Sequence, residues 1–228
     1  MGELIEHVEL RDKYVVFEDR GDAGRRLAVF LEKRGVKGDL VLAIPNGGVA
    51  VGAEVSISLG LRLAVAVTRK ITFPWTTEAG FGAVSWTGEV EVDASALRYL
   101  GEEEYEKCLS RAKRSVEERV RMFKEFLPPN SLAGVSVLLV DDGLATGYTM
   151  LVAVKTVEKL GAGEVTVAVP TASQGAVELL LRHVDRLAVL NLRTGFPYAV
   201  ADAYKFWRDL GEHEVLAMLY SLRKLGLA

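Results

Sequence analysis

The chain has 228 residues, half of them hydrophobic, and its 28 basic and 31 acidic residues give a net charge of −3. This balance argues against a general nucleic-acid binder or membrane-surface binder. No apolar run has the length that a bilayer-spanning helix needs. The opening stretch, MGELIEHVELRDKY, is too acidic for a signal peptide. We therefore expect a cytoplasmic protein that binds neither nucleic acid nor membrane.

The first half of the chain alternates short apolar runs with helical patterns. We expect strands at 14–17, 39–44 and 62–68 and helices at 21–35 and 49–59. An irregular stretch, ITFPWTTEAGFG (71–82), precedes a hairpin that GAVSW and EVEVD form around Thr87-Gly88. A long, charged helical region at 95–127 then ends at two prolines. Its charges indicate a solvated face or a dimer contact.

The second half continues the alternation. We expect strands at 135–140, 164–169 and 186–192 and helices at 147–160, 174–183 and 212–224. Buried strands that alternate with helices predict an α/β fold, with a mostly parallel sheet covered by helices on both faces and a small hood or insert. The single cysteine, Cys108, excludes an internal disulfide framework, and only three histidines accompany it, which argues against a zinc site.

The stretch VLLVDDGLATGYTM (137–150) carries the strongest chemistry in the chain. Asp141 and Asp142 end a buried strand, where two carboxylates are costly unless something uses them. Carboxylates only accept hydrogen bonds, so a ribose diol is a natural partner. The alternative is that the acids only end a strand or cap a helix. One acid after an apolar strand is common in that role, whereas two adjacent acids followed by a TG-x-T turn are much rarer.

A glycine- and threonine-rich loop follows the two acids and leads into a helix. Its N–H groups, two hydroxyls and the positive end of the helix predict a phosphate site beside the diol site. Phosphate and diol together describe a ribose 5-phosphate. The predicted phosphate ligands are Gly143, Leu144, Ala145, Thr146, Gly147, Tyr148 and Thr149.

The segment VLLVDDGLATGYT resembles the 5-phosphoribosyl pyrophosphate (PRPP) motif of type I phosphoribosyltransferases. Similarity to a prokaryotic branch of that family extends over nearly the whole chain, through AIPNGGVAVGAEVS, VTRKI, PWTTEAGFGAV, AVPTAS and FPYAVADAYKFW. The resemblance implies one phosphoribosyltransferase domain over residues 1–228. Within it, 71–127 would hold a lid loop, a hairpin and a helical insert, and about 193–228 a C-terminal hood.

A second glycine-rich loop, PNGGVAVG (45–52), follows the strand at 39–44 and opens a helix. It does not fit the dinucleotide-binding pattern G-x-G-x-x-G. The resemblance makes it the pyrophosphate loop, with Asn46, Gly47 and Gly48 as ligands, although relatives usually carry a basic residue where this chain has Asn46. The alternative is a tight strand–helix turn without a ligand.

Three further features complete the predicted site. Arg69 and Lys70 would neutralise pyrophosphate, with Lys70 acting in catalysis beside the acid pair, unless they are merely a solvated basic pair. Residues 71–82 suit a mobile lid or an ordinary surface loop. Where the resemblance places the nucleobase floor, Phe196 or Tyr198 could stack on a base with Asp202 nearby; such aromatics are also common in cores.

The resemblance implies an enzyme that transfers the phosphoribosyl group of PRPP to a nitrogenous acceptor, a nucleobase, and releases pyrophosphate. Mg²⁺ would be the cofactor, bound through substrate oxygens and water rather than by a protein cage. We also expect a homodimer. Two alternatives stay open: a non-catalytic PRPP-binding regulator, and an enzyme that acts on another phosphosugar.

Overall fold

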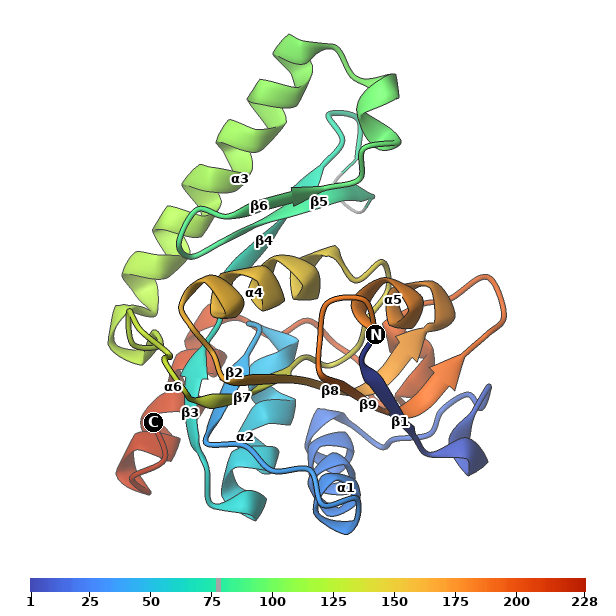
Figure 1. Ribbon diagram of the computed structural model, residues 1–228, viewed down its shortest axis with the longest axis vertical. Coiled ribbons are helices and arrows are strands. Elements are labelled where there is room, and N and C mark those ends of the chain that lie inside the picture. The colour runs from blue at the N-terminus through green and yellow to red at the C-terminus, as the bar shows by residue number, and fades with distance from the viewer. Residues whose placement is uncertain (77–78) are drawn as a thin grey trace.

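The structure is a computed structural model and describes residues 1–76 and 79–228. Within these ranges, a six-stranded parallel sheet forms the centre of the molecule, in the order β1-β9-β8-β7-β2-β3 (Figure 1). Its strands are β1 (Glu3–Glu6), β2 (Leu40–Ala43), β3 (Arg62–Val65), β7 (Ser136–Val140), β8 (Glu164–Ser173) and β9 (Arg186–Arg193). The predicted α/β fold with a mostly parallel sheet is confirmed.

Side chains of the parallel strands alternate between two hydrophobic layers, one on each face of the sheet. In β2, Val41 and Ala43 belong to one layer and Leu42 to the other. The first layer is covered by α1 (Arg20–Lys33), α2 (Gly47–Leu59) and α6 (Glu212–Lys224), and the second by α4 (Tyr148–Lys159) and α5 (Gln174–Leu180) (Figure 1). Burial on both faces explains why these strands read as almost unbroken apolar runs.

A smaller antiparallel sheet lies over α4, outside the parallel sheet (Figure 1). Its strands are β4 (Thr68–Thr72), β5 (Gly80–Ser85) and β6 (Val90–Val92), and the long helix α3 (Glu102–Met122) packs against β4 and β5. The rings of Phe81 and Tyr105 hold β5 to α3, with their centroids 6.2 Å apart. We call this small sheet together with α3, residues 68–122, the insert layer. It packs on the core of the molecule along α4.

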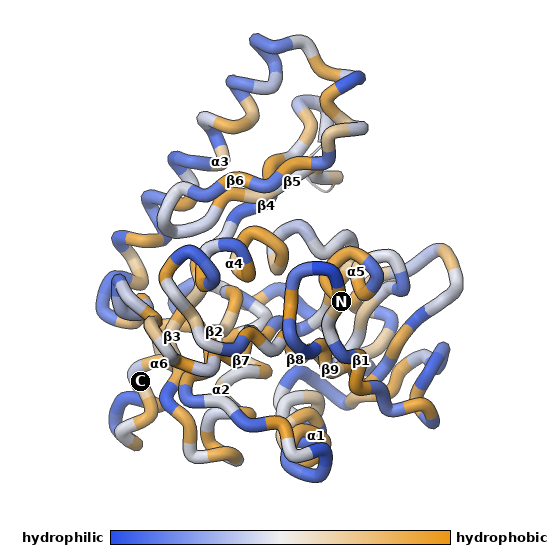
Figure 2. The backbone as a smooth tube through the Cα atoms, in the orientation of Figure 1, coloured by the Kyte–Doolittle hydropathy of each residue, from blue (hydrophilic) through white to orange (hydrophobic). Residues whose placement is uncertain are grey.

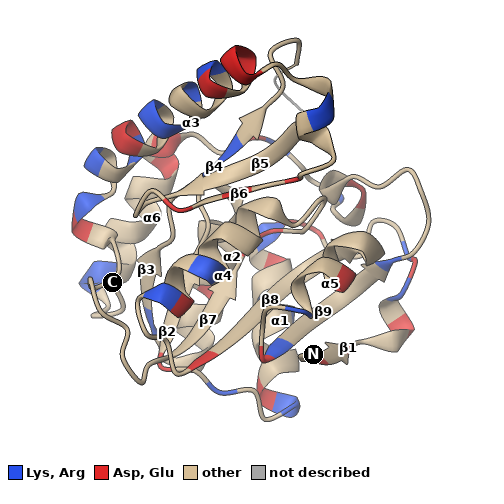
Figure 3. Ribbon diagram, turned by 45° about the horizontal axis from the view of Figure 1, so that its top comes forward, with Lys and Arg blue, Asp and Glu red and all other residues tan. Residues whose placement is uncertain are grey.

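Helix α3 combines a buried stripe with a charged outer face. Figure 2 shows hydrophobic and hydrophilic stretches alternating along it, and Figure 3 shows basic and acidic residues interspersed on its outside. Its buried residues are Cys108, Leu109, Ala112, Val116 and Arg119. Mixed charge on the outer face is typical of a solvated helix. Among the described residues, no helix is long and apolar enough to cross a membrane.

The predicted strand at 14–17 is wrong. Only Phe17 forms a bridge, with Tyr204, and Val15 has a positive φ of 49°. The segment is extended because its N–H groups bond an irregular part of the chain: Val15 donates to Asp202 and Phe17 donates to Ala203. The first strand of the sheet is β1 instead, an edge strand whose two glutamates conceal its pattern.

The single strand expected at 62–68 is divided between the two sheets. β3 ends at Val65 and β4 begins at Thr68, where the chain leaves the parallel sheet. Every residue from 63 to 68 is buried. The break therefore leaves no polar mark, which is why hydrophobic periodicity did not predict it.

Other differences are smaller. The stretch 71–82 is less irregular than expected, because β4 continues to Thr72 and β5 begins at Gly80; residues 77 and 78 of the predicted lid lie outside the described residues. The hairpin is confirmed and gains β4 as a third strand. The helical region at 95–127 is α3 with a short 3-10 turn on each side, at Ala96–Tyr99 and Lys124–Phe126. The remaining helices and strands are confirmed apart from shifts at their ends.

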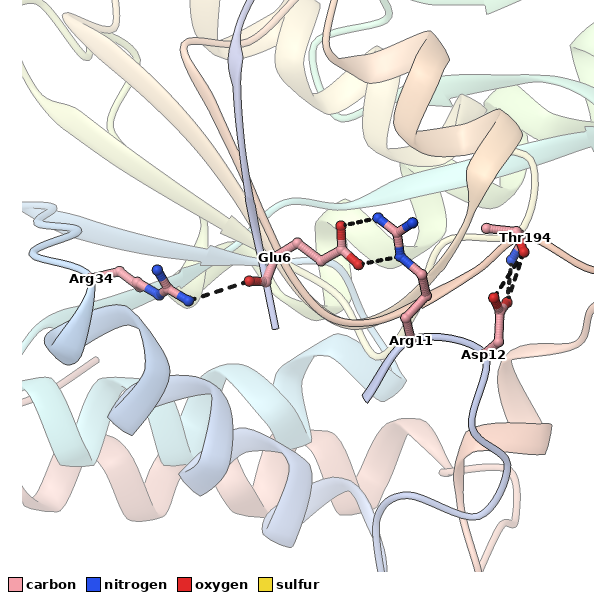
Figure 4. A network of polar contacts seen from close by, with 5 residues as sticks. All are labelled: Glu6, Arg11, Asp12, Arg34 and Thr194. Carbon is pink, nitrogen blue, oxygen red and sulfur yellow. Dashed lines mark hydrogen bonds and ion pairs between the residues drawn. The ribbon is translucent and has the colours of Figure 1, made fainter. Parts of the chain in front are cut away.

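Polar contacts fasten the N-terminal segment beside the end of β9 (Figure 4). Arg11 makes a two-pronged bond to Glu6, with Nε 2.6 Å from Oε1 and a terminal nitrogen 2.5 Å from Oε2. Asp12 accepts from the N–H of Thr194 at 2.6 Å, and this bond lowers the pKa of Asp12. Thr194 begins the C-terminal segment that crosses the edge of the sheet, so these contacts set the path of that segment.

Candidate functional site

The two glycine-rich loops meet at the carboxyl edge of the parallel sheet. The 45–48 loop follows β2, and the acid pair follows β7, the strand beside it. A Cβ atom on Gly47 would lie 1.8 Å from Oδ2 of Asp142, and one on Gly48 would lie 2.9 Å from Oδ1 of Asp141. The loop backbone therefore approaches the two carboxylates so closely that only glycine fits.

The acid pair is held by a short network of hydrogen bonds. The N–H of Asp142 donates to Oδ1 of Asp141 at 2.8 Å. Nε of Arg20 donates to Oδ2 of Asp142 at 2.7 Å, and the hydroxyl of Tyr204 donates to the Asp142 carbonyl at 2.6 Å. Each acid is thus oriented before any ligand arrives, and one of them already has a cationic partner.

The two carboxylates differ in their pKa values, because their charged neighbours differ. Burial raises the pKa of Asp141 well above its usual value, and the neighbouring charge of Asp142 raises it further. Burial also raises the pKa of Asp142, but Arg20 opposes this effect. Groups with shifted pKa values in a cleft are candidates for function, because a ligand that relieves the burial can change their protonation.

Arg20 was not among the predicted site residues. It lies in the first turn of α1, is only 8% exposed, and also donates to the carbonyl of Arg208 at 2.9 Å. Its guanidinium stacks on Trp207 at 3.8 Å from the ring centre. The Arg20–Asp142 contact joins residues 122 positions apart, so no local pattern could have indicated it.

The 143–149 loop is anchored to the end of β8. The N–H of Leu144 donates to the carbonyl of Thr171 at 3.0 Å, and the N–H of Ser173 donates back to Leu144 at 2.9 Å. Leu144 is buried and its N–H is engaged, so it supports the loop from below. Gly147 has a φ of 85° and caps α4, a conformation that favours glycine.

The exposed side of the 143–149 loop suits an anion. Ala145 and Thr146 are exposed, and α4 begins at Tyr148. The first N–H groups of a helix have no partner within the helix and carry its positive dipole. Thr146 precedes the helix, and Thr149 lies in its first turn. The loop thus follows the acid pair and leads into a helix N-terminus, and its role as a phosphate site stays a prediction.

The 45–48 loop is held by its asparagine. The Pro45–Asn46 peptide bond is cis. Nδ2 of Asn46 donates to the carbonyl of Leu210 at 2.6 Å, and Oδ1 accepts from Arg119 of α3. The side chain of Asn46 is thus directed into the protein, toward α3 and α6, and the loop faces the acid pair with its glycine backbone.

Arg69 and Lys70 belong to the insert layer rather than to the parallel sheet. Both line a cavity of about 380 Å³ between β4 and α3, together with Arg111. Nε of Arg69 donates to Oγ of Ser115 at 3.0 Å. The two cations directly follow the strand expected at 62–68, which would have put them at the end of a strand of the parallel sheet; they lie in β4 of the three-stranded sheet instead.

The three predicted base-site residues have different surroundings. Phe196 is 97% exposed. The hydroxyl of Tyr198 donates to Thr171 at 3.3 Å, and burial raises the pKa of Tyr198. Asp202 accepts from the N–H of Ala199 at 3.3 Å within its own turn. Tyr198 therefore lies near the acid pair, whereas Phe196 points to solvent.

The acid pair is the donor set that suits a hard cation. Among the described residues, no group of three or more His, Cys, Asp or Glu side chains is arranged so that it could hold a metal ion. Carboxylate oxygens are ligands that Mg²⁺ accepts, and Mg²⁺ usually keeps several waters and takes one or two carboxylates beside substrate phosphates. Asp141 and Asp142 therefore suit a Mg²⁺ ion that would be held mainly by substrate oxygens and water beside the two carboxylates.

Comparisons with known proteins give one answer. A family model described as the phosphoribosyl transferase domain matches residues 17–188. A protein named as a phosphoribosyl transferase in Mycobacterium tuberculosis is 33% identical over 214 residues, which is 90% of this chain and 46% of that protein. The chain therefore spans about half the length of the curated relative that it matches.

Two further matches differ in extent. The crystal structure of TT1426 from Thermus thermophilus superposes with a TM-score of 0.71 at 35% identity, over 90% of this chain and 98% of that one. A ribose-phosphate pyrophosphokinase of Pyrococcus furiosus is 47% identical over 60 residues, which is 25% of this chain and 22% of that protein. With the family match over most of its length, the chain belongs to the phosphoribosyl transferase family.

Proposed function

We propose that the protein binds PRPP with Mg²⁺ and transfers its 5-phosphoribosyl group to a nitrogenous acceptor of the nucleobase class, releasing pyrophosphate. One observation carries the proposal. The two half-buried carboxylates, Asp141 and Asp142, lie between an anion-suited loop on one side and a glycine loop in contact distance on the other. A diol flanked by a phosphate and a pyrophosphate is the ligand that matches this order.

The 5′-phosphate binds the 143–149 loop. N–H groups at the start of α4 and the hydroxyls of Thr146 and Thr149 donate to its oxygens. The ribose hydroxyls donate to Asp141 and Asp142. Because Arg20 neutralises part of the charge of Asp142, the acid pair can remain beside two phosphate groups without excessive repulsion.

The pyrophosphate binds beside the 45–48 loop, through the N–H groups of Gly47 and Gly48. Lys70 and Arg69 approach from the insert layer. Mg²⁺ would be held mainly by substrate oxygens and water near Asp141 and Asp142, and it would supply neutralisation of the charge on the leaving group. The side chain of Asn46 is engaged with Leu210 and Arg119, so Asn46 contributes through its backbone.

Transfer requires little covalent chemistry from the chain. A lone pair on the acceptor nitrogen forms the bond to ribose C1 while the C1–O bond to pyrophosphate breaks, and the leaving oxygen keeps the electrons. Positive charge grows at C1 as in other glycosyl transfers. The carboxylates of the acid pair favour that charge, and the fixed loops hold the reacting atoms in line.

The acceptor site lies under the C-terminal segment, with Tyr198 bonded to Thr171 and Phe196 exposed and free to stack. Within the predicted lid at 71–82, the connection from β4 to β5 that carries Trp75 would exclude water while the C1 centre is exposed. We also propose a homodimer in the cytoplasm.

A second function has one observation in its favour. The side chain of Asn46 cannot reach a pyrophosphate without breaking its bonds to Leu210 and Arg119. A chain that keeps the ribose 5-phosphate site and has weak contact with the leaving group would serve as a PRPP-binding regulator without turnover.

A screen of acceptors separates the two functions. Purines, pyrimidines and other nitrogenous acceptors are supplied with PRPP and Mg²⁺, and release of pyrophosphate is followed with a coupled assay. Acceptor-dependent release supports the transferase. PRPP binding without release with any acceptor supports the regulator, and absence of PRPP binding contradicts both.

A further inference from the structure

A buried arginine of the insert layer reaches the 45–48 loop from a distance of 73 positions in the sequence. Arg119 lies on the inner face of α3 and is 5% exposed. Its guanidinium donates to Oδ1 of Asn46, and its Nε lies 3.2 Å from a carboxylate oxygen of Glu212, in the first turn of α6. Three segments, namely the loop, α3 and the start of α6, therefore meet at one side chain.

An asparagine at position 46 satisfies both of its partners. It accepts from Arg119 and donates to the carbonyl of Leu210. An aspartate could accept from Arg119 but has no donor for Leu210, and a lysine could donate to Leu210 but would repel Arg119. The pairing of asparagine with arginine thus fixes the orientation of the residue that precedes the two glycines.

The buried charge is costly for a purely structural contact. Burial lowers the pKa of Arg119, and nearby Arg69 lowers it further, while Glu212 opposes both. Although it lies near Glu212, Nε of Arg119 has no well-aligned hydrogen-bond partner among the described residues. A neutral, apolar side chain at this position would avoid these costs. Two arginines gathered beside a loop that faces the acid pair are favourable when an anion binds there.

We propose that Arg119 is a positioning residue for the pyrophosphate part of the substrate. Through Asn46 it holds the backbone of Gly47 and Gly48 toward the acid pair, and it couples the loop to the insert layer that carries Arg69 and Lys70. The inference rests on the proposed function, because it assigns the pyrophosphate to this loop.

The test compares three probes, inorganic pyrophosphate, PRPP and ribose 5-phosphate, each titrated with Mg²⁺ into the full chain by calorimetry. Arg119→Gln removes one charge-assisted hydrogen bond, so the affinity for pyrophosphate and for PRPP should fall by about tenfold or more. The affinity for ribose 5-phosphate should fall by less than about twofold. Arg119→Lys keeps the charge and one donor, so it should recover most of the pyrophosphate affinity. Arg121→Gln, on the exposed face of α3, is the matched control and should change none of the three.

Asn46→Ala approaches the same contact from the loop and leaves α3 intact. It should show the ligand profile of Arg119→Gln, and the double variant should be no weaker than either single one, because both remove one interaction. If the wild type binds PRPP and both variants bind pyrophosphate normally, or if all three probes weaken equally, the positioning role is wrong and the proposed function stands. If the wild type binds neither PRPP nor pyrophosphate, the proposed function and this inference both fail.

Discussion

The two glycine-rich loops at the edge of the sheet are built in opposite ways. The 143–149 loop takes its shape from local features: Gly147 with a positive φ, the start of α4, and a clasp to the neighbouring strand through Leu144. The 45–48 loop depends on distant parts of the chain. Asn46 is held by Arg119 and by the carbonyl of Leu210, 73 and 164 positions away.

Because one loop is held by nearby residues and the other by distant ones, we expect the two loops to differ in rigidity. A local loop keeps its shape as long as its own strand and helix are folded. A loop held by distant contacts responds when those segments move, and one of them, α3, belongs to the insert layer. The ribose 5-phosphate half of the site should therefore be rigid, and the pyrophosphate half should depend on the position of the insert layer.

Among single substitutions in the two loops, the largest expected effect comes from adding one methyl group to the 45–48 loop. In Gly47→Ala the new Cβ would overlap Oδ2 of Asp142. We expect PRPP affinity to fall by at least about a hundredfold, or ~3 kcal/mol, in calorimetry. Gly175→Ala on α5 has open space around its Cβ and serves as the control. Equal affinity in Gly47→Ala and wild type would mean that the two loops do not share a ligand.

The 143–149 loop should show a smaller, graded response. Thr146→Val keeps the shape of the side chain and removes a hydrogen-bond donor. The affinity for ribose 5-phosphate should therefore fall by up to about tenfold, while the circular dichroism spectrum stays unaltered. Gly147→Val should cost more, because valine strongly disfavours the positive φ. Thr87→Val, in the remote hairpin turn, is the control. Unchanged affinity in both loop variants would place the phosphate elsewhere.

The sequence predicted the local loop and the parallel core well, because both depend on neighbouring residues. Val and Leu runs indicated β7 and the other core strands, and the DDG-x-x-TG pattern indicated the acid pair and the turn after it. What it did not predict rests on contacts between distant residues. Arg20 and Arg119 reach the site from α1 and α3, and nothing in their own segments marks them as different from surface arginines.

Two errors in the fold have the same origin. Tyr14-Val-Val-Phe17 has the composition of a strand, but its partner is the irregular segment around Tyr204 rather than a strand. β1, with the sequence ELIE, looks polar because it is an edge strand with exposed acids. Composition does not tell which segment lies alongside, and in the first segment it did not even report burial, since Tyr14 and Val15 are exposed.

Protons should be released when the ligand binds. The raised pKa values of Asp141 and Asp142 mean that the free protein holds a proton to higher pH than ordinary carboxyls do. For such groups folded stability falls as pH rises through the window between the unfolded and folded pKa values. Mg²⁺ and the ribose hydroxyls favour the ionised pair, so PRPP affinity should fall as pH falls through the raised pKa. Calorimetry in buffers of different ionisation enthalpy measures the release; absence of proton release at every pH at which the protein is folded would contradict it.

The smallest expected signal is a change at the lid. Trp75 is 65% exposed and stacks on Phe73 with ring centroids 5.1 Å apart. In a variant with Trp86→Phe and Trp207→Phe, emission should shift to shorter wavelength on adding PRPP and Mg²⁺, because closure takes Trp75 out of water. Proteolysis between Ile71 and Gly82 should slow. If neither emission nor cleavage responds at saturating PRPP, residues 71–82 are an ordinary surface loop.

The most direct test of the account is the affinity for PRPP with Mg²⁺ of Asp141→Asn/Asp142→Asn beside that of wild type. Each charge-assisted hydrogen bond to a ribose hydroxyl contributes roughly 1.5–3 kcal/mol, so the double variant should bind more weakly by roughly 3–6 kcal/mol. Asp39→Asn removes a carboxylate at the opposite edge of the same two strands, where Asp39 accepts from Ser136, and should bind PRPP as wild type does. Equal PRPP affinity in wild type and the double variant would contradict the claim that the acid pair binds the ribose.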